Sequence, residues 1–162
     1  MALTRIEIDE LTWSTASKAR RLDWSATMDA LVDPDNLVAD NTASSLKIEL
    51  MPEQYRFQMY DSDHRLLHDL SVHYRDFEPY VDEYKDIVEH IYRAQQTGEL
   101  HRVDTLDMAK KVAHDRAGRF LKRELRDMRF DLGTARRLFT LILALRFDTL
   151  RWGQIGPHRT LP

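Results

Sequence analysis

Three histidines and four aspartates that lie close together in the sequence are the residues best suited to bind a metal ion. They are His64, His68 and His73 with Asp61, Asp63, Asp69 and Asp76. Imidazole and carboxylate groups together suit zinc, manganese or iron. However, His68 and His73 would point to opposite faces of a strand, and His64 falls in a turn. We therefore expect no metal site and no cofactor here, and we interpret His68 as a core histidine with a hydrogen-bond partner.

A second group of residues that could do chemistry surrounds His114. Lys110 and Lys111 precede it by about one helical turn, and Asp115 follows it directly. A histidine beside a carboxylate can act as a general base. No nucleophile motif, oxyanion-hole motif or phosphate loop accompanies it in the sequence, so an enzyme is the less favoured interpretation. If the protein binds a small ligand, the predicted pocket contains His68, His73, His114 and Tyr60.

Basic side chains are the strongest functional signal in the sequence. Residues 107–162 carry 13 Lys and Arg against 6 Asp and Glu, whereas residues 1–106 carry 11 against 21. Such a distribution can serve an acidic protein partner, the acidic half of a second copy, or nucleic-acid phosphates, and it can also be a solvated helix face. The predicted partner-binding face contains Lys110, Lys111, Arg119, Lys122, Arg123, Arg126, Arg136 and Arg137.

Nucleic acid is the less favoured of these partners. Base stacking needs aromatic side chains interleaved with the charges, and the basic face has none. The pI of about 6.2 also argues against a dedicated nucleic-acid-binding protein. Any nucleic-acid complex would therefore be non-specific, and its affinity would depend on the salt concentration.

Alternating apolar and polar residues predict three strands, and these strands contain Tyr60, His68 and His73 of the predicted pocket. The alternation covers residues 46–51, 55–60 and 66–73, with turn-forming residues in between. This pattern predicts an antiparallel meander with one apolar face and one wet face. A shorter alternation over residues 3–9 predicts an edge strand that joins the same sheet.

Apolar residues at three- and four-residue spacing predict four helices. The early helix is capped by Ser14 or Thr15, and the first long helix covers about residues 77–96. The second long helix opens at residue 104 or 105 and has Val112 on its apolar stripe.

The last helix begins after Gly133-Thr134 and is apolar on almost every side. A helix of this kind must be buried all round, either inside one chain or in a dimer interface.

The order of these elements favours an α+β fold. We expect a small antiparallel sheet, made of the three-strand meander plus the N-terminal strand, packed against three C-terminal helices and one early helix. The sequence predicts a single domain over residues 1–151 and a flexible tail over residues 152–162. The longest apolar stretch, from Leu138 to Leu145, is too short to span a bilayer, and the first residues lack the apolar run of a signal peptide. We therefore expect a cytoplasmic protein with no membrane partner.

Two motifs lie in the last two predicted helices. The first runs from Leu106 to Gly118, and the second reads Thr134-Ala-Arg-Arg-Leu-Phe-Thr-Leu-Ile142. Both resemble a bacterial family known as uncharacterised protein family 0262. The resemblance implies a soluble bacterial protein and carries no activity with it. This sequence departs from the family at Gly133, where the family has an aspartate, so no acidic role is carried over to that position. The residues of the first motif that carry the resemblance are Asp107, Met108, Lys110, Lys111, His114 and Gly118.

From these patterns we expect a non-enzymatic interaction or assembly protein. It would bind an acidic partner or itself through the basic helix, and it would form a homo-oligomer. One alternative is a small-ligand-binding protein or enzyme with a histidine-containing pocket. The other is a non-specific nucleic-acid-binding protein.

Overall fold

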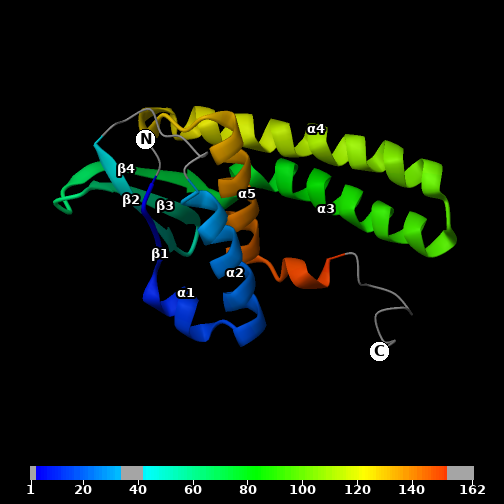
Figure 1. The fold of residues 1–162 in the computed structure, drawn as a ribbon, viewed down its shortest axis with the longest axis horizontal. Helices are drawn as coiled ribbons and strands as arrows, with labels where there is room; N and C mark the ends of the chain where they lie inside the picture. The colour runs from blue at the N-terminus through cyan, green and yellow to red at the C-terminus, as the bar shows by residue number, and fades with distance from the viewer. Residues whose placement is uncertain (1–2, 34–41, 153–162) are drawn as a thin grey trace.

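A computed structural model of the chain describes residues 3–33 and 42–152. The elements are, in order, β1 (Arg5–Ile8), α1 (Glu10–Thr15), α2 (Lys18–Leu31), β2 (Ala43–Leu50), β3 (Gln54–Asp61), β4 (Leu66–His73), α3 (Tyr74–Thr97), α4 (Leu100–Glu124), the 3₁₀ turn η1 (Arg126–Met128), α5 (Leu132–Arg146) and the 3₁₀ turn η2 (Thr149–Arg151). This order confirms the predicted α+β fold, with one sheet and a set of helices packed against it (Figure 1).

The sheet has four strands in the order β1-β2-β3-β4. The meander of β2, β3 and β4 is antiparallel, with Phe57 opposite both Ile48 and Leu70, and β1 joins it as the edge strand. One detail differs from the expectation: β1 runs parallel to β2, so the sheet is mixed. The reason is that α1 and α2 lie between the two strands and carry the chain back to the starting end of the sheet.

The two faces of the sheet have opposite character, as the alternation predicts. Ile48, Phe57 and Met59 are fully buried on one face. On the other face, Arg56 forms ion pairs with Asp69 and Glu49. The helices therefore cover a single face of the sheet.

Helix α5 lies at the centre of the molecule, in contact with α2 and α4. The Tyr55 hydroxyl of β3 donates a hydrogen bond to the Ile142 carbonyl at 2.8 Å, and the Trp24 indole of α2 donates to the Ala144 carbonyl at 2.9 Å. One chain therefore covers this apolar helix by itself. A dimer interface is not needed to bury this helix, so its apolar character no longer supports the predicted homo-oligomer.

The early helical segment is two helices, and its predicted caps are wrong. The Asp9 carboxylate caps α1 by accepting from the Thr12 backbone N–H at 3.0 Å, and the Ser17 hydroxyl caps α2 by accepting from that of Arg20 at 3.2 Å. Ser14 and Thr15 lie at the end of α1 instead. Several residues here have cap-forming side chains, and local sequence does not choose among them.

The starts of the last two helices also differ from the prediction. Helix α4 begins at Leu100 rather than at residue 104 or 105, because Gly98 ends α3 in the left-handed conformation, with φ of 74°, and the chain re-enters a helix almost at once. Helix α5 is capped by Asp131, whose carboxylate accepts from the Thr134 N–H at 2.8 Å. Gly133 therefore lies inside the first turn, and the acidic cap stands two residues before it.

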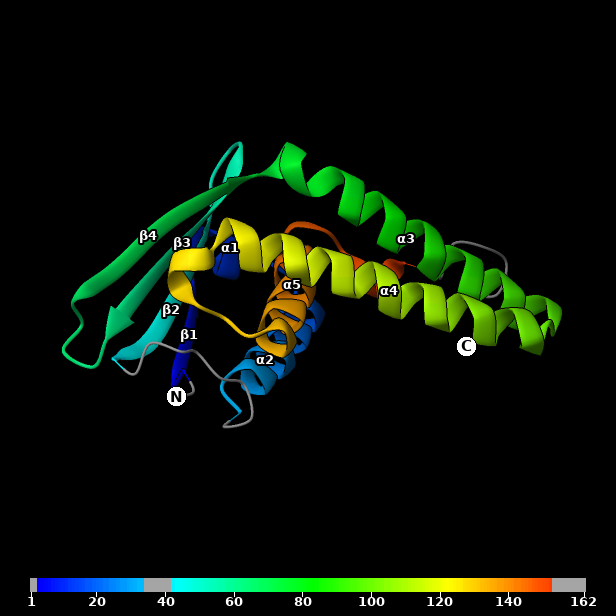
Figure 2. The same cartoon turned by 90° about the horizontal axis from the view of Figure 1, so that it is seen from above.

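Helices α3 and α4 form an antiparallel pair whose outer half projects away from the sheet, beyond α5, in both views (Figures 1 and 2). Their inner halves contribute Phe77, Val81, Phe120 and Leu121 to the core. Among the described residues, no helix combines the length and the apolar character needed to cross a membrane. Of the predicted tail, only Trp152 lies within the described residues, and its ring packs 5.9 Å from that of Phe147.

Gly118 of α4 allows α5 to approach closely. A Cβ atom at this position would lie 2.8 Å from Cγ of Arg136 and 3.2 Å from Cδ1 of Leu132. At Gly133, in contrast, the nearest atom to such a Cβ is 4.0 Å away. Both glycines have helical backbones, so alanine is the better helix former at each by up to about 1 kcal/mol.

We predict opposite effects of alanine at these two glycines. Gly118→Ala should destabilise the protein on the order of 1 kcal/mol, because an overpacking cost of about 1–3 kcal/mol exceeds the gain in helix propensity. Gly133→Ala should stabilise it by about 0.4–1 kcal/mol. Urea unfolding of the two variants and the wild type measures both changes. Equal effects of the two substitutions would show that α4 and α5 do not meet at Gly118.

Candidate functional site

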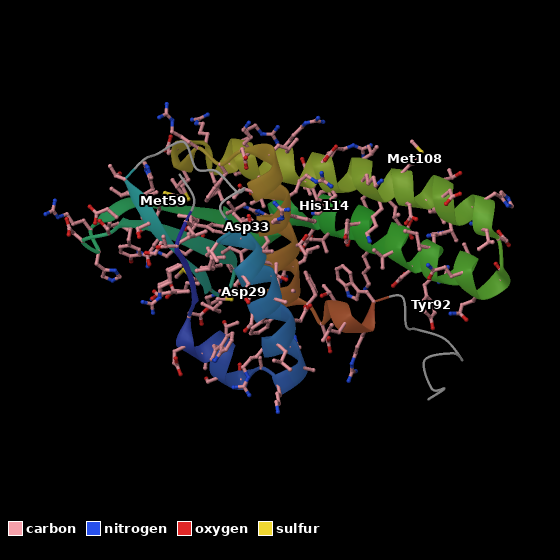
Figure 3. All side chains as sticks on the ribbon, viewed as in Figure 1. Asp29, Asp33, Met59, Tyr92, Met108 and His114 are labelled. Atoms are coloured by element: carbon pink, nitrogen blue, oxygen red, sulfur yellow. The ribbon has the colours of Figure 1, made fainter. Side chains whose placement is uncertain are left out.

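The outer face of α4 combines cations with exposed apolar side chains. Met108 and Val112 are 69% and 50% exposed. Figure 3 shows Met108 pointing away from α3 and from the body of the molecule. Lys111 and Val112 follow Met108 by three and four residues, so both lie beside it on one broad face of the helix. Helical spacing placed Val112 on the buried stripe, so the sequence did not predict this patch.

The predicted basic face divides into two groups in the structure. Lys110, Lys111 and Arg136 line a cleft between α3, α4 and α5. The remaining residues, all exposed, continue along the inner end of α4 and onto η1 and α5: Arg119, Lys122, Arg123, Arg126 and Arg137. We call Met108, Lys111, Val112, Arg119 and Lys122 the outer patch of α4, and Lys111 stands at its border with the cleft.

The three cations of the outer patch are not used in ion pairs that hold the described part of the fold together. Lys111, Arg119 and Lys122 form no ion pair with any residue that the structure describes. Arg116, on the α3 side of the same helix, is by contrast paired with Glu83 of α3. The fold thus leaves the positive charge of the patch available to a partner.

The cleft has a volume of about 370 Å³ and lies beside the crossing of α4 and α5, where Figure 3 labels His114. It brings together four residues of the first sequence motif with Arg136 of the second. Its lining consists of Tyr84, Asp107, Lys110, Lys111, His114 and Arg136.

Neighbouring side chains hold two of the cleft cations in place. The Asp115 carboxylate forms an ion pair with Arg136, 3.1 Å from Nε, although the geometry is not that of a hydrogen bond. The two terminal nitrogens of Arg136 form no hydrogen bond with a described residue. Nζ of Lys110 lies 5.8 Å from the centre of the Tyr84 ring, a cation–π distance. Arg136 and Lys110 are therefore both held near the cleft, and their remaining N–H groups can donate hydrogen bonds to an anion.

The hydrogen bonds of His114 determine its tautomer. Nε2 lies 2.8 Å from the Arg136 carbonyl oxygen, and that oxygen can only accept, so Nε2 carries the hydrogen. The Thr140 hydroxyl is 3.1 Å from the same nitrogen. Nδ1 forms no hydrogen bond within the described part of the chain. In the neutral ring, Nδ1 is therefore an acceptor on a residue that lines the cleft.

Burial keeps His114 neutral and Tyr84 protonated. Desolvation lowers the pKa of His114, and the positive charges of Arg136 and Lys110 lower it further. The hydrogen bond to the Arg136 carbonyl and the negative charge of Asp115 raise the pKa, but they do not offset the lowering. Desolvation raises the pKa of Tyr84, and Arg136 opposes that shift. At neutral pH the cleft therefore presents cationic and hydroxyl donors together with the Asp107 carboxylate and His114 Nδ1 as acceptors.

The other residues of the predicted pocket are not part of this cleft. His68 is half-buried on the core side of β4, opposite Met59. The Tyr60 ring stacks on that of His64 at 4.8 Å, in the β3–β4 turn region. His73 stands at the start of α3 and lines a separate cleft with Glu53. The structure thus brings only His114 of the predicted pocket together with part of the predicted basic face.

Two residues of the cleft escaped the sequence-based prediction of the site. Tyr84 comes from α3, and only tertiary packing places it beside α4. Asp107 stands one turn before Lys111 in the first motif, so its helical spacing was the available signal.

Comparisons with known proteins identify a family. A family model described as uncharacterised protein family UPF0262 matches residues 1–148. A UPF0262 protein of Caulobacter vibrioides is 27% identical over 146 residues, which is 88% of this chain and 91% of the relative. One of Phenylobacterium zucineum is 27% identical over 150 residues, 90% of this chain and 92% of the relative. One of a Ruegeria species is 38% identical over 72 residues, 44% of this chain and 45% of the relative. No solved structure matches this chain significantly.

We predict that His114 makes the stability of the protein depend on pH. The unfolded chain protonates this histidine near pH 6.5, whereas the folded chain, with its lowered pKa, protonates it only at lower pH. Below about pH 6.5 the unfolded state therefore binds more protons, and stability falls as the pH decreases. The groups that face the ring are Lys110 and Asp115 on α4, Arg136 and Thr140 on α5, and Tyr84 on α3.

His114→Gln removes this contribution. The stability advantage of the wild type over the variant should be largest at neutral pH and should shrink on acidification, as measured by urea unfolding at several pH values. His101→Gln, at an exposed position of the same helix, is the control for the loss of a histidine. A difference between wild type and His114→Gln that is constant with pH would contradict the assignment.

Proposed function

The chain belongs to the uncharacterised protein family UPF0262, and on that premise we propose its function from the geometry of α4: it is a non-enzymatic interaction protein that binds an acidic, amphipathic segment of a protein partner. The binding surface is the outer patch of α4. The observation that carries the proposal is the exposure of Met108 and Val112 among cations that form no ion pair with described residues.

The charge of the patch favours an acidic partner. Helix α4 contains seven Lys and Arg against four Asp and Glu. Complementary charge across an interface accelerates association and excludes partners of the wrong sign. Exposed ion pairs contribute little affinity by themselves, so a stable complex also needs apolar contact.

Met108 and Val112 supply that apolar contact, and they favour protein over nucleic acid. Methionine is adaptable and is common at surfaces that bind helical partners. A phosphate backbone would not cover these aliphatic side chains, and base stacking would need aromatic rings in their place. An amphipathic acidic helix presents both the apolar and the negative groups that the patch requires.

A second copy of this chain is the other occupant to test. Helix α3 is acidic, with six Asp and Glu against three Lys and Arg, so it complements α4 in charge. A dimer in which α3 of one copy packs on α4 of the other would use the same outer patch. Light-scattering mass with and without added peptide separates this occupant from an external partner.

We predict that a synthetic amphipathic helix of leucine and glutamate binds the protein, as measured by fluorescence anisotropy. Replacing Met108 and Val112 together by Gln should weaken binding on the order of tenfold, because part of the burial energy of two apolar side chains is lost. Lys111→Glu with Lys122→Glu should weaken it as well, and added salt should reduce the affinity.

The control variant is Leu11→Gln, since Leu11 is 74% exposed on α1 and lies outside the patch. A single-stranded oligonucleotide of equal net charge is the competing probe. Tighter binding of the oligonucleotide, unaffected by the Met108 and Val112 substitutions, would support the nucleic-acid alternative instead. A peptide that fails to bind, or that binds all variants equally, would overturn the proposal.

A further inference from the structure

The cleft at His114 is a second, chemically distinct site. We propose that it binds a small phosphate monoester that carries free hydroxyl groups, such as a phosphorylated polyol or sugar. Lys111 belongs to both sites, but the inference does not need the outer patch, because Asp107, Lys110, His114 and Arg136 of the cleft lie outside that patch.

The cations of the cleft provide the phosphate subsite. Lys110, Lys111 and Arg136 converge on one cleft from two helices. Arg136 forms an ion pair with Asp115 on its Nε side, and its terminal nitrogens form no hydrogen bond with a described residue, so they can donate to a phosphate oxygen. The Tyr84 hydroxyl, which forms no hydrogen bond within the described residues, is a further donor.

The acceptors of the cleft distinguish the ligand from a bare anion. Asp107 repels a fully ionised group, and Nδ1 of His114 can only accept while the ring is neutral. A hydroxyl group donates to either of them. The cleft thus favours a ligand with negative oxygens for the cations and hydroxyl groups for Asp107 and His114. Phosphorylated polyols and sugars contain both.

The size of the cleft agrees with this ligand class. Its volume of about 370 Å³ falls within the usual range for small-molecule sites. A phosphate group alone fills only a small part of it, so the ester portion has room beside Asp107 and His114. Gly118 contributes indirectly, because its missing side chain allows Arg136 to lie against α4.

Two probes of equal charge test the proposal by isothermal titration calorimetry at matched ionic strength. Glycerol 3-phosphate carries two hydroxyl groups, and propyl phosphate carries none. The wild type should bind glycerol 3-phosphate about tenfold more tightly, because its hydroxyls donate to the Asp107 carboxylate and to Nδ1 of the half-buried His114. Lys110→Met should weaken both ligands by about tenfold or more. Asp107→Asn should reduce the preference for glycerol 3-phosphate.

Lys122→Met is the matched control, because it removes the same charge from the same helix outside the cleft. It should leave phosphate-ester binding unchanged while weakening the acidic peptide, whereas Lys110→Met should do the reverse. The two proposals can therefore fail separately. Sulfate that binds as tightly as glycerol 3-phosphate, no preference between the two esters, or unchanged binding in Lys110→Met would each overturn the inference. Circular dichroism and urea unfolding confirm that the variants are folded.

Discussion

Helix α5 is apolar on nearly every side, and the other elements are arranged to cover it. Its last turn also leaves backbone carbonyls without a donor inside the helix, among them those of the buried Ala144 and Leu145. Arg20 of α2 donates from Nη2 to the Ala144 carbonyl at 2.8 Å and to that of Phe147 at 3.2 Å, and the Trp24 indole donates to Ala144 as well. Tyr55 reaches α5 from the sheet. These polar contacts fix how α2 and the sheet sit against α5.

The packing of α5 also creates the cleft at His114. Its N-terminal half crosses α4 at Gly118, which places Arg136 beside His114 and joins two sequence motifs in one cleft. Beyond this crossing α5 no longer covers α3 and α4, so their outer half has no third layer (Figure 2). Met108 lies on the side of α4 that faces away from the body of the molecule, and it is 69% exposed. The cleft therefore depends on the crossing of α4 and α5, whereas the outer patch lies on the opposite, solvent-facing side of α4.

Interactions between neighbours in the sequence explain why most elements were predictable. The two-residue alternation located β2, β3 and β4, and the three- and four-residue spacing located α3 and α5. Gly98 was a reliable end signal because only glycine adopts its left-handed conformation without strain. Caps were harder, since Asp9 and Ser17 competed with other polar residues nearby. The direction of β1 could not be predicted in the same way, because it depends on the path that α1 and α2 take between β1 and β2. The alternation within a strand carries no information about that path.

The sequence alone determined the fold class, the family, the burial of the last helix and the presence of a cationic segment around His114. Each of these depends on composition, on spacing within one element or on a continuous motif. Only the tertiary structure decided which groups share a site: it separated His68, His73 and Tyr60 from His114 and added Tyr84. It also exposed Val112, which helical spacing had assigned to the core. The physical reason is that a side chain's partners depend on where the other helices end and cross, and that is set by packing between distant segments.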